Sequence, residues 1–293
     1  MMRLFQRLLC ALTLTAAATS TAWANDKTIT ILTQQDVYND YQKFIGQRDP
    51  LTLSNYGGPG SRRDVVEIVL VMQALKAGGN DLPIKLVKVD NSSDSYNRYI
   101  KEIMTGNVTM GGNSAWQIDL KPLSDKVFVS EPVIRNGEFE AGFYTTADNV
   151  EARLTRTLPE LQKLTAVVAD SWKPDVATLE SLKFSNLLKT QSWDSMVGML
   201  VKKRADVVLA PFQPTPDLSM DVGGKKLVPI TNVKVGLQGS RHFFVSRLDP
   251  NGALVAKQLN IGLDRLRDKG IIEKAYRESG FFNSATKSWN RLN

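Results

Sequence analysis

The chain has 293 residues and 42% apolar side chains, enough for one large domain or two lobes around a sizeable core. Its 37 basic and 30 acidic residues give a formal charge of +7, spread along the chain without a basic block or a nucleic-acid motif, so we expect no nucleic-acid partner. The single cysteine, Cys10, excludes an intramolecular disulfide and a cysteine metal site.

The first 24 residues have the pattern of a secretory signal peptide. Arg3 and Arg7 give a basic start, residues 8–18 are apolar or small, and Ala22-Trp23-Ala24 is an A-x-A cleavage site. A membrane anchor fits less well, because the apolar run is shorter than the ~20 residues that a span requires. We therefore expect cleavage after Ala24 and a mature chain that is free in a bacterial periplasm, without its only thiol.

The first half begins with an alternating, β-rich strand over residues 28–33, followed by a polar stretch over 34–50 that shows no clear element. A glycine-rich turn over 55–64, which includes the expected ligand contact Tyr56, then leads into a helix with Ser61 as its N-cap, and Gly78-Gly79 ends that helix. Backbone N–H groups at such a helix start can bind an anion. Turn and capping chemistry is the simpler explanation, and no Gly-Lys-Ser/Thr of a nucleotide-binding loop follows.

A strand over 84–89 and a helix over 96–104 precede a short strand that runs into Gly111-Gly112-Asn113-Ser114, with Trp116 close by. Glycine permits a ligand to approach the backbone, and Trp116 would then form the wall of a pocket. Alternatively, Trp116 anchors the core, and Asn113 and Ser114 only cap the next helix. The sequence leaves both interpretations open.

Strands and helices alternate from residue 164 to residue 212. The pattern predicts strand 164–169, helix 175–182, a short strand, helix 193–203 and strand 205–210. Such alternation is typical of an α/β fold with parallel pairing and helices that cover the sheet. Ligands of these sheets bind beyond the carboxyl ends of the strands. We therefore expect a small molecule near Asp170-Ser171-Trp172 and near Phe212.

Further strands are predicted on both sides of this unit, and helices near the end of the chain. The expected strands cover 127–134, 137–145, 227–235 and 242–246, and the expected helices cover 252–270 and 271–279.

In this order, the segments resemble the extracellular solute-binding proteins of the amino-acid-binding type (family 3), which have the two-lobed periplasmic binding protein fold. The resemblance is carried by Val129-Ser130-Glu131-Pro132, by residues 167–182, by the strand 205–210 after a basic helix end, and by residues 244–276. Each motif is loose by itself. Their order, along nearly the whole mature chain, is the specific part.

The resemblance implies two α/β lobes, each with a central, mostly parallel sheet flanked by helices, and a chain that crosses between them twice. Residues 25–132 and 243–293 would build lobe 1, and residues 133–242 would build lobe 2 with the hinge segments. The lobes would close on a small ligand. Gly112, Asn113 and Ser114 would hold it from one side, and Asp170, Ser171 and Trp172 from the other.

Two departures from the family pattern bear on the ligand. The family's amino-acid binders carry an arginine shortly after the Gly/Ser loop, whereas here Lys121 is the only basic residue in that region, and lysine lacks the planar fork that binds a carboxylate bidentately. They also carry an acidic residue after the strand 205–210, where Pro211 and Phe212 stand. We therefore expect a small polar or anionic ligand other than a standard α-amino acid.

The resemblance implies a binding protein rather than an enzyme, a monomer without cofactor or metal that serves an ABC-type uptake system through a membrane permease. Two alternatives stay open: a periplasmic sensor or partner protein on the same fold, and a dehydratase-like enzyme. Catalysis would require a positioned acid or base. His242, the only histidine, has no Ser or Asp partner at a recognisable catalytic spacing, so we expect a structural or surface role for it.

Overall fold

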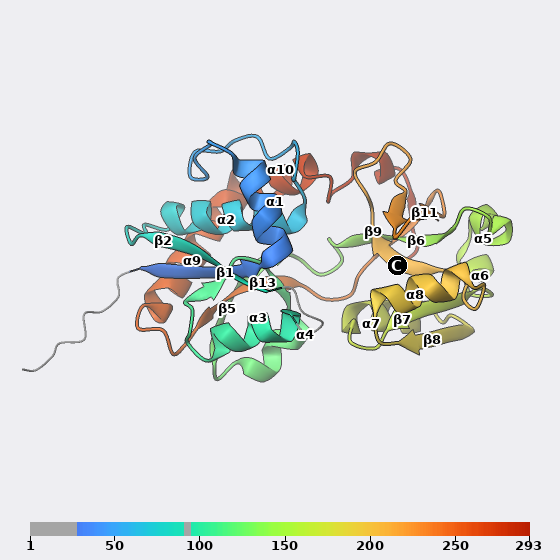
Figure 1. Ribbon diagram of the computed structural model, residues 1–293, viewed down its shortest axis with the longest axis horizontal. Coiled ribbons are helices and arrows are strands. Elements are labelled where there is room, and N and C mark those ends of the chain that lie inside the picture. The colour runs from blue at the N-terminus through green and yellow to red at the C-terminus, as the bar shows by residue number, and fades with distance from the viewer. Residues whose placement is uncertain (1–27, 91–94) are drawn as a thin grey trace, which may run out of the picture.

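The computed structural model describes residues 28–90 and 95–293, so the predicted signal peptide lies outside the described residues. The described chain forms two lobes side by side, each with its own central sheet, joined by segments in the middle of the molecule (Figure 1). We call the lobe that contains β1 lobe 1 and the other lobe 2. Within the described ranges, no helix combines the length and the apolar character needed to cross a membrane.

Lobe 1 is built on a sheet of six strands, in the order β2-β1-β3-β13-β4 with β5 also paired to β13. The strands are β1 (Ile29–Gln34), β2 (Ile84–Val89), β3 (Met110–Gly111), β4 (Ala115–Trp116), β5 (Val127–Ile134) and β13 (Arg241–Ser246). β1 pairs in parallel with β2 and β3, whereas β13 is antiparallel to β3, β4 and β5. The sheet is therefore mixed, and the predicted parallel pairing holds only on the β1 side.

Helices cover both faces of this sheet. They are α1 (Gln35–Ile45), α2 (Arg63–Ala77), α3 (Ser95–Met104), α4 (Gln117–Leu120), α9 (Gly252–Asp268) and α10 (Ile271–Glu278), with a short 3-10 helix η1 (Lys121–Leu123) after α4. Side chains of a strand alternate between faces. Ile31 and Phe243 accordingly pack in the cluster of α2 and α9, and Leu32 and Phe244 pack in the cluster of α3.

Lobe 2 contains one sheet of six strands and a strand pair. The strands are β6 (Glu140–Thr146), β7 (Thr165–Ala169), β8 (Asn186–Thr190), β9 (Val208–Pro211), β10 (Met220–Val222), β11 (Lys225–Pro229), β12 (Val233–Gly236) and β14 (Asn290–Arg291). The helices are α5 (Val150–Leu154), α6 (Leu158–Leu161), α7 (Lys173–Ser181) and α8 (Trp193–Val201), and η2 (Ser284–Thr286) is a 3-10 helix. β7 and β8 pair in parallel, and a bridge from Ala166 to Val207 extends this pairing toward β9, as the alternating pattern predicted.

The chain passes between the lobes through residues 135–139, which connect β5 to β6, and through residues 237–240, which connect β12 to β13. These are the two predicted crossings. The tail then returns to lobe 2, because β14 pairs in parallel with β12. The last residues therefore belong to the sheet of lobe 2, although the prediction assigned the whole segment 243–293 to lobe 1. No observation tests the remaining lobe boundaries, which stay a prediction.

Several local predictions were wrong. The polar stretch 34–50 contains α1, whose buried side chains Val37, Tyr41 and Phe44 are too sparse to produce a clear apolar pattern. Ser61 does not cap α2, because the helix begins at Arg63 and the Ser61 hydroxyl donates to the carbonyl of Tyr56 at 2.5 Å. The pairing of β6 with β9, β11 and β12 is antiparallel, so the sheet of lobe 2 is also mixed.

Candidate functional site

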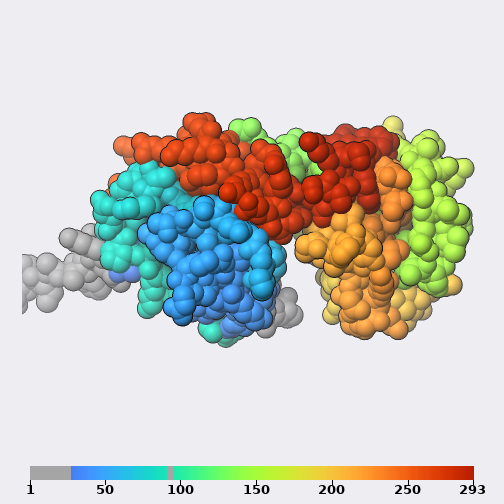
Figure 2. All heavy atoms as spheres, turned by 90° about the horizontal axis from the view of Figure 1, so that it is seen from above, coloured from blue at the N-terminus to red at the C-terminus, as the bar shows by residue number. Residues whose placement is uncertain are grey.

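The two lobes face each other across a cleft, which Figure 2 shows open on one side and closed on the other by the C-terminal part of the chain. The segment 112–116 between β3 and β4 lies on the lobe 1 side, with the start of α2 behind it. The start of α7 lies on the lobe 2 side, where Lys173 reaches α4 of lobe 1. Most of the ligand contacts predicted from the sequence lie in the segment 112–116 or directly before α7.

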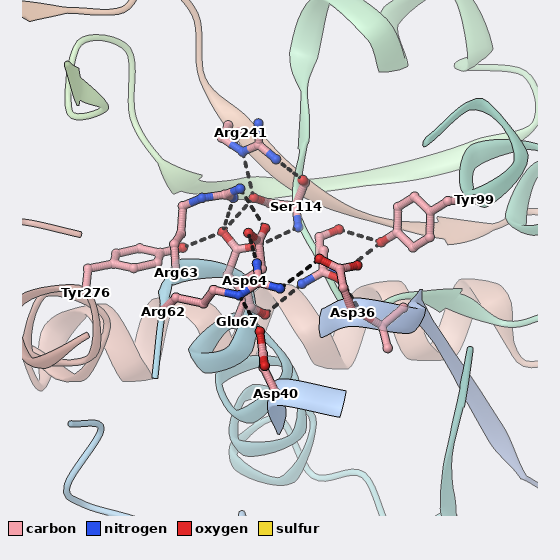
Figure 3. Close-up of polar contacts among 12 residues, drawn as sticks. Asp36, Asp40, Arg62, Arg63, Asp64, Glu67, Tyr99, Ser114, Arg241 and Tyr276 are labelled. Carbon is pink, nitrogen blue, oxygen red and sulfur yellow. Dashed lines mark hydrogen bonds and ion pairs between the residues drawn. The ribbon is translucent and has the colours of Figure 1, made fainter. Parts of the chain in front are cut away.

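A buried carboxylate organises the lobe 1 side of the cleft (Figure 3). Glu67, in the middle of α2, has no exposed surface and accepts hydrogen bonds from the backbone N–H and the hydroxyl of Ser114, at 2.8 and 2.7 Å. Arg63 and the hydroxyl of Tyr276 donate to the same carboxylate, each at 3.1 Å. Burial and the Glu67 charge raise the pKa of Tyr276, which keeps its hydroxyl protonated as a donor. These four bonds compensate for the loss of water around a buried charge.

Asn113 is held in place by lobe 1 in a similar way. Its Oδ1 accepts from the Thr33 hydroxyl at 2.5 Å, and its Nδ2 donates to the backbone carbonyl of Asp64 at 2.7 Å. Its backbone carbonyl and N–H also bond to the hydroxyl of Tyr99, at 2.6 and 3.0 Å. A side chain on the preceding Gly112 would collide with the core. The loop is therefore buried, and its polar atoms are already paired.

Arg241, the first residue of β13, is a cleft residue that the sequence analysis missed. Its Nε donates to the Ser114 hydroxyl at 3.0 Å, and Nη2 donates to the Ser114 carbonyl. The guanidinium lies over Trp116, 4.9 Å from the ring centroid. Burial and the charge of Arg63 lower the pKa of Arg241. No residue in the described ranges accepts a hydrogen bond from Nη1, so this nitrogen is available to a ligand. A strand that is 127 residues away thus supplies the arginine that is missing after the loop.

Further ion pairs surround this centre. Arg62 donates to Asp36 at 2.9 Å and to Asp40 and Asp64 at 3.0 Å, and Arg63 also pairs with Asp64, at 2.6 Å. Burial alone would raise the pKa of Asp64, but the charges of Arg63, Arg62 and Arg241 outweigh burial and lower it. Figure 3 shows these side chains converging from α1, α2 and β13. The network fixes the arginines in position before any ligand arrives.

The lobe 2 side of the cleft is different, because its predicted contacts are exposed. Asp170 and Ser171 lie in the turn after β7, and α7 begins only at Lys173, so Ser171 does not start the helix. Trp172 stacks on Trp193, with ring centroids 6.0 Å apart and an interplanar angle of 14°. No residue in the described part of the chain bonds to the Ser171 hydroxyl, which leaves it free to contact a ligand.

Two residues of α7 lie close to lobe 1. Lys173 Nζ is 3.4 Å from Asp119 Oδ1 in α4, an ion pair that joins the two lobes. Asp175 is 9% exposed, and burial raises the pKa of its carboxyl to about 7 although the charge of Arg241 opposes this shift. Asp175 belongs to α7 of lobe 2 and Arg241 to β13 of lobe 1, so the two groups stand on opposite sides of the cleft. They are too far apart to form an ion pair. Asp175 is the second functional candidate that the sequence analysis missed.

Of the other three predicted contacts, two are buried inside a lobe and one is exposed. Tyr56 is in the lobe 1 core, and its hydroxyl donates to Gln73 Oε1 at 2.6 Å. Phe212 is buried in lobe 2, where its ring packs edge to face against Trp289 at 5.2 Å. Lys121 is exposed in η1. Tyr56 and Phe212 are therefore engaged inside the lobes, whereas Lys121 as a ligand contact stays a prediction.

His242 has a structural role. Its Nδ1 lies 2.7 Å from the carbonyl of Ser130, and its Nε2 lies 2.7 Å from the hydroxyl of Ser240. Burial lowers the pKa of the imidazole, so the neutral ring is favoured. Both nitrogens are thus engaged in connecting β13 with β5 and the second crossing. In the described ranges, no group of three or more His, Cys, Asp and Glu side chains is arranged to hold a metal ion.

Comparison with known proteins identifies the fold. No protein-family model matches the sequence, and no curated protein sequence matches it either. Among solved structures, the periplasmic VFT2 domain of BvgS from Bordetella pertussis aligns with 87% of this chain and 94% of its own, at a TM-score of 0.53 and 14% identity. Substrate-binding domain 2 of GlnP from Lactococcus lactis, in an open conformation, aligns with 86% of this chain and 95% of its own, at a TM-score of 0.51 and 11% identity.

A third similar structure is ytmK from Bacillus subtilis, described as a probable amino-acid ABC transporter extracellular-binding protein. It aligns with 85% of this chain and 95% of its own, at a TM-score of 0.50 and 13% identity. The structural neighbours thus include family 3 amino-acid-binding proteins, as the sequence resemblance predicted. At these identities, the likeness establishes the two-lobed periplasmic binding protein fold.

Proposed function

We propose that this chain is a periplasmic solute-binding protein that clamps a small polar ligand between its two lobes and serves an ABC-type uptake system. The observation that carries this proposal is the position of Arg241 and Asp175. The guanidinium of Arg241 lies on Trp116 in lobe 1, and the buried carboxyl of Asp175 belongs to lobe 2, without an ion pair between them. A ligand with an acceptor for Arg241 and a donor for Asp175 would connect the lobes.

The chemistry of the two groups narrows the ligand. Nη1 of Arg241 is free toward the described residues and is held rigidly by its bonds to Ser114, so an anionic or carbonyl oxygen can bind there without reorganising the arginine. The flat face of Trp116 suits the apolar part of a small molecule. An ammonium or another N–H donor would stabilise Asp175 in its charged form. The sequence lacks the arginine and the acidic residue at the positions usual in the family. Under this proposal, Arg241 and Asp175 supply these charges from other segments.

Under this proposal, the Gly/Ser loop 112–114 does not contact the ligand directly, contrary to the prediction from the sequence. Glu67 occupies the donors of Ser114, and Thr33 and Asp64 occupy the side chain of Asn113. We therefore propose that Trp116 and Arg241 contact the ligand from lobe 1, with the loop as their support. On lobe 2, we propose Ser171, Trp172 and Asp175.

The structural neighbours support a binding role rather than a catalytic one. Two of them are titled as substrate-binding or extracellular-binding proteins, and one of these titles names an amino-acid ABC transporter. We carry this role over to the present chain as part of the proposal, with a membrane permease as partner and a monomer as the binding unit.

The test is a thermal-shift screen of the purified protein against amino acids, polyamines, organic acids and phosphonates. A ligand at 100 times its dissociation constant stabilises the folded state by about 2.7 kcal/mol, which raises Tm by several degrees. We expect one class to raise Tm, and Trp116→Ala and Asp175→Asn to weaken its binding about tenfold or more. Ile118→Ala, an exposed residue of the neighbouring α4, is the matched control and should leave affinity unchanged.

If the ligand raises Tm equally in the unaltered protein, in Trp116→Ala, in Asp175→Asn and in the control Ile118→Ala, the proposed contacts are contradicted. If no class raises Tm, the clamping role itself fails. In that case the fully paired loop on lobe 1 would favour the alternative of a periplasmic sensor or partner protein, which needs the fold but no tight ligand. Retained interaction with a membrane protein by cross-linking in cells would then support that alternative.

A further inference from the structure

A second cavity lies beside the hinge, between α10 and the C-terminal tail. Its volume is about 840 Å³, within the range of small-molecule sites. One wall is formed by the first crossing together with the end of α9 and α10, and the other by β12, η2 and β14. Figure 2 shows green residues of the first crossing between α10 and the darker red tail. We call this cavity the hinge groove.

The hinge groove has an excess of positive charge. Three of its lining residues are acidic, namely Glu138, Glu140 and Glu273. Six are basic: Arg135, Lys234, Arg267, Arg277, Lys287 and Arg291. The basic residues come from both lobes, because Arg135, Arg267 and Arg277 stand on the lobe 1 side and the other three stand on β12 and the tail. An anion in the groove would therefore be surrounded by cations from both sides.

The acidic residues neutralise only part of this charge. Lys234 pairs with Glu140 at 2.9 Å, and Arg277 pairs with Glu273 one turn away in α10. The carboxylate of Glu138 accepts from the backbone N–H of Arg135 at 2.8 Å. Within the described ranges, Arg135, Arg267 and Lys287 pair with no Asp or Glu carboxylate. Arg291 donates to the main-chain oxygen of Asn293, the last residue of the printed sequence, at 2.9 Å.

Two of these unpaired cations repel each other. Arg267 is part-buried and donates to the carbonyls of Pro132 and Val133, which fixes its guanidinium at the wall of the groove. Burial and the charge of Arg135 lower the pKa of Arg267. The charges of Glu138 and Asp264 act in the opposite direction without restoring the pKa of Arg267. The excess of basic over acidic residues in the groove creates a positive potential that a bound anion would relieve.

On the opposite wall, the tail holds Arg291 in a defined position. The side chain of Asn293 bonds to both the N–H and the carbonyl of Gly236, each at 2.9 Å, and the Arg291 Nε donates to the Asn293 carbonyl at 2.9 Å. The guanidinium lies against Gly137 and Gly236, where a Cβ would collide with it. Arg291 is therefore held by the backbone of β12 on its own wall and contacts the first crossing on the facing wall.

We propose that the hinge groove binds a small polyanion with several phosphate or carboxylate oxygens, which bridges the cations of the lobe 1 side and those of the tail. The planar guanidinium forks of Arg135, Arg267 and Arg291 suit such oxygens. The site is separate from the cleft and does not depend on the ligand proposed there. Because the groove includes the first crossing, the polyanion would favour one angle between the lobes and would thereby change affinity in the cleft.

The test uses calorimetric titration of the purified protein with pyrophosphate and with citrate, at constant ionic strength. We expect saturable binding of at least one of them. Arg135→Gln and Lys287→Gln, which are exposed and unpaired, should each weaken binding about fivefold without unfolding the protein. The matched control is Lys163→Gln combined with Lys225→Gln, which removes two exposed charges elsewhere in lobe 2 and should leave affinity unchanged.

Preference for pyrophosphate or for citrate will distinguish a phosphate ligand from a polycarboxylate. The proposal is overturned if neither anion binds saturably, or if the control variant weakens binding as much as the combination of Arg135→Gln and Lys287→Gln. If only one of Arg135→Gln and Lys287→Gln weakens binding, the anion contacts only one wall of the groove. The proposal that it bridges the two lobes is then wrong.

Discussion

The two sides of the cleft differ in how far their polar side chains are buried and bonded to other residues. On lobe 1, Ser114 and Arg241 are buried and bonded to each other, and Ser114 is also bonded to Glu67, so the wall is preorganised before a ligand binds. On lobe 2, the segment 170–172 is exposed, and Asp175 is buried without an ion pair. One wall is thus preorganised, whereas the other combines exposed side chains with a buried carboxyl that forms no ion pair with a described residue.

This difference suggests a division of labour. A preorganised wall orients a ligand at little entropic cost, because its side chains do not have to be ordered on binding. An incompletely satisfied wall gains most when the lobes close, because a ligand then supplies the missing partner. We therefore expect mutations in the buried network around Glu67 on lobe 1 to act mainly on stability, and mutations of Asp175 on lobe 2 to act mainly on pH dependence and closure.

The largest effect is expected for Glu67→Gln. The substitution removes one of the two carboxylates that pair with Arg63, the other being Asp64, and it removes the buried charge that accepts from Ser114 and Tyr276. Breaking a buried charge pair by removing one partner costs about 3 to 5 kcal/mol, because the other charge remains buried. We expect the free energy of unfolding, measured by urea denaturation, to fall by about this amount.

The control for this prediction is Glu180→Gln. Glu180 is exposed and pairs with Lys189 at 3.4 Å on the surface of lobe 2, so the loss should stay within about 0.5 kcal/mol. Similar losses in the two variants would mean that Glu67 does not organise the wall, and the contrast between the two sides would disappear.

The fold could be predicted from the sequence because its signals are local. The alternation of strands and helices over 164–210 gave the parallel pairing of β7 and β8, and glycines after α2 and α9 marked their ends. The antiparallel pairing of β13 had no such signal, since it depends on how the chain returns from lobe 2. α1 was missed for a local reason, because few of its side chains are apolar.

The site could be predicted only in part, because it depends on contacts between distant residues. Gly112, Asn113 and Ser114 were found from their composition, but the bonds of Ser114 to Glu67 and Arg241 span 47 and 127 residues. Glu67 had one signal that was not used: it is a lone acid within the otherwise apolar run Val65–Val71, as expected for a buried charge with a partner. Arg241 has no comparable local signal.

The second prediction concerns the Asp175 carboxyl of the lobe 2 wall and the pH dependence of the free energy of unfolding. The Asp175 carboxyl has a pKa of about 7 in the folded protein, against 3.8 for the unperturbed group. Between these values the folded state holds a proton that the unfolded state has lost, so this group makes stability fall as pH rises. Asp175→Asn cannot ionise and should become more stable than the unaltered protein by about 2 to 4 kcal/mol at pH 8.

The measurement is urea denaturation of both proteins at pH 4, 6 and 8. The values at pH 4 serve as the internal control, since Asp175 is then largely neutral in the folded state and the two curves should nearly coincide. Parallel profiles from pH 4 to pH 8 would show that water or a neighbouring group satisfies the carboxylate. The lobe 2 wall would then be as complete as the wall on lobe 1.

The smallest effect is expected for the ion pair between the two walls. Lys173 is 51% exposed and Asp119 is 18% exposed, and such pairs contribute about 0.2 to 1 kcal/mol. Asp119 also accepts from the hydroxyl of Tyr96 at 3.0 Å, so a single substitution would mix two contacts. A double-mutant cycle with Lys173→Gln and Asp119→Asn separates them.

We expect a coupling free energy in this range at low ionic strength and a smaller one in about 0.5 M NaCl, because salt screens partly exposed charges. The coupling reports on the lobes directly, since both residues must be close for it to exist. A coupling of zero at low salt would mean that α7 and α4 are apart in solution. Arg241 and Asp175 would then face each other only after a ligand closes the cleft, and the comparison of the two walls would describe the bound state.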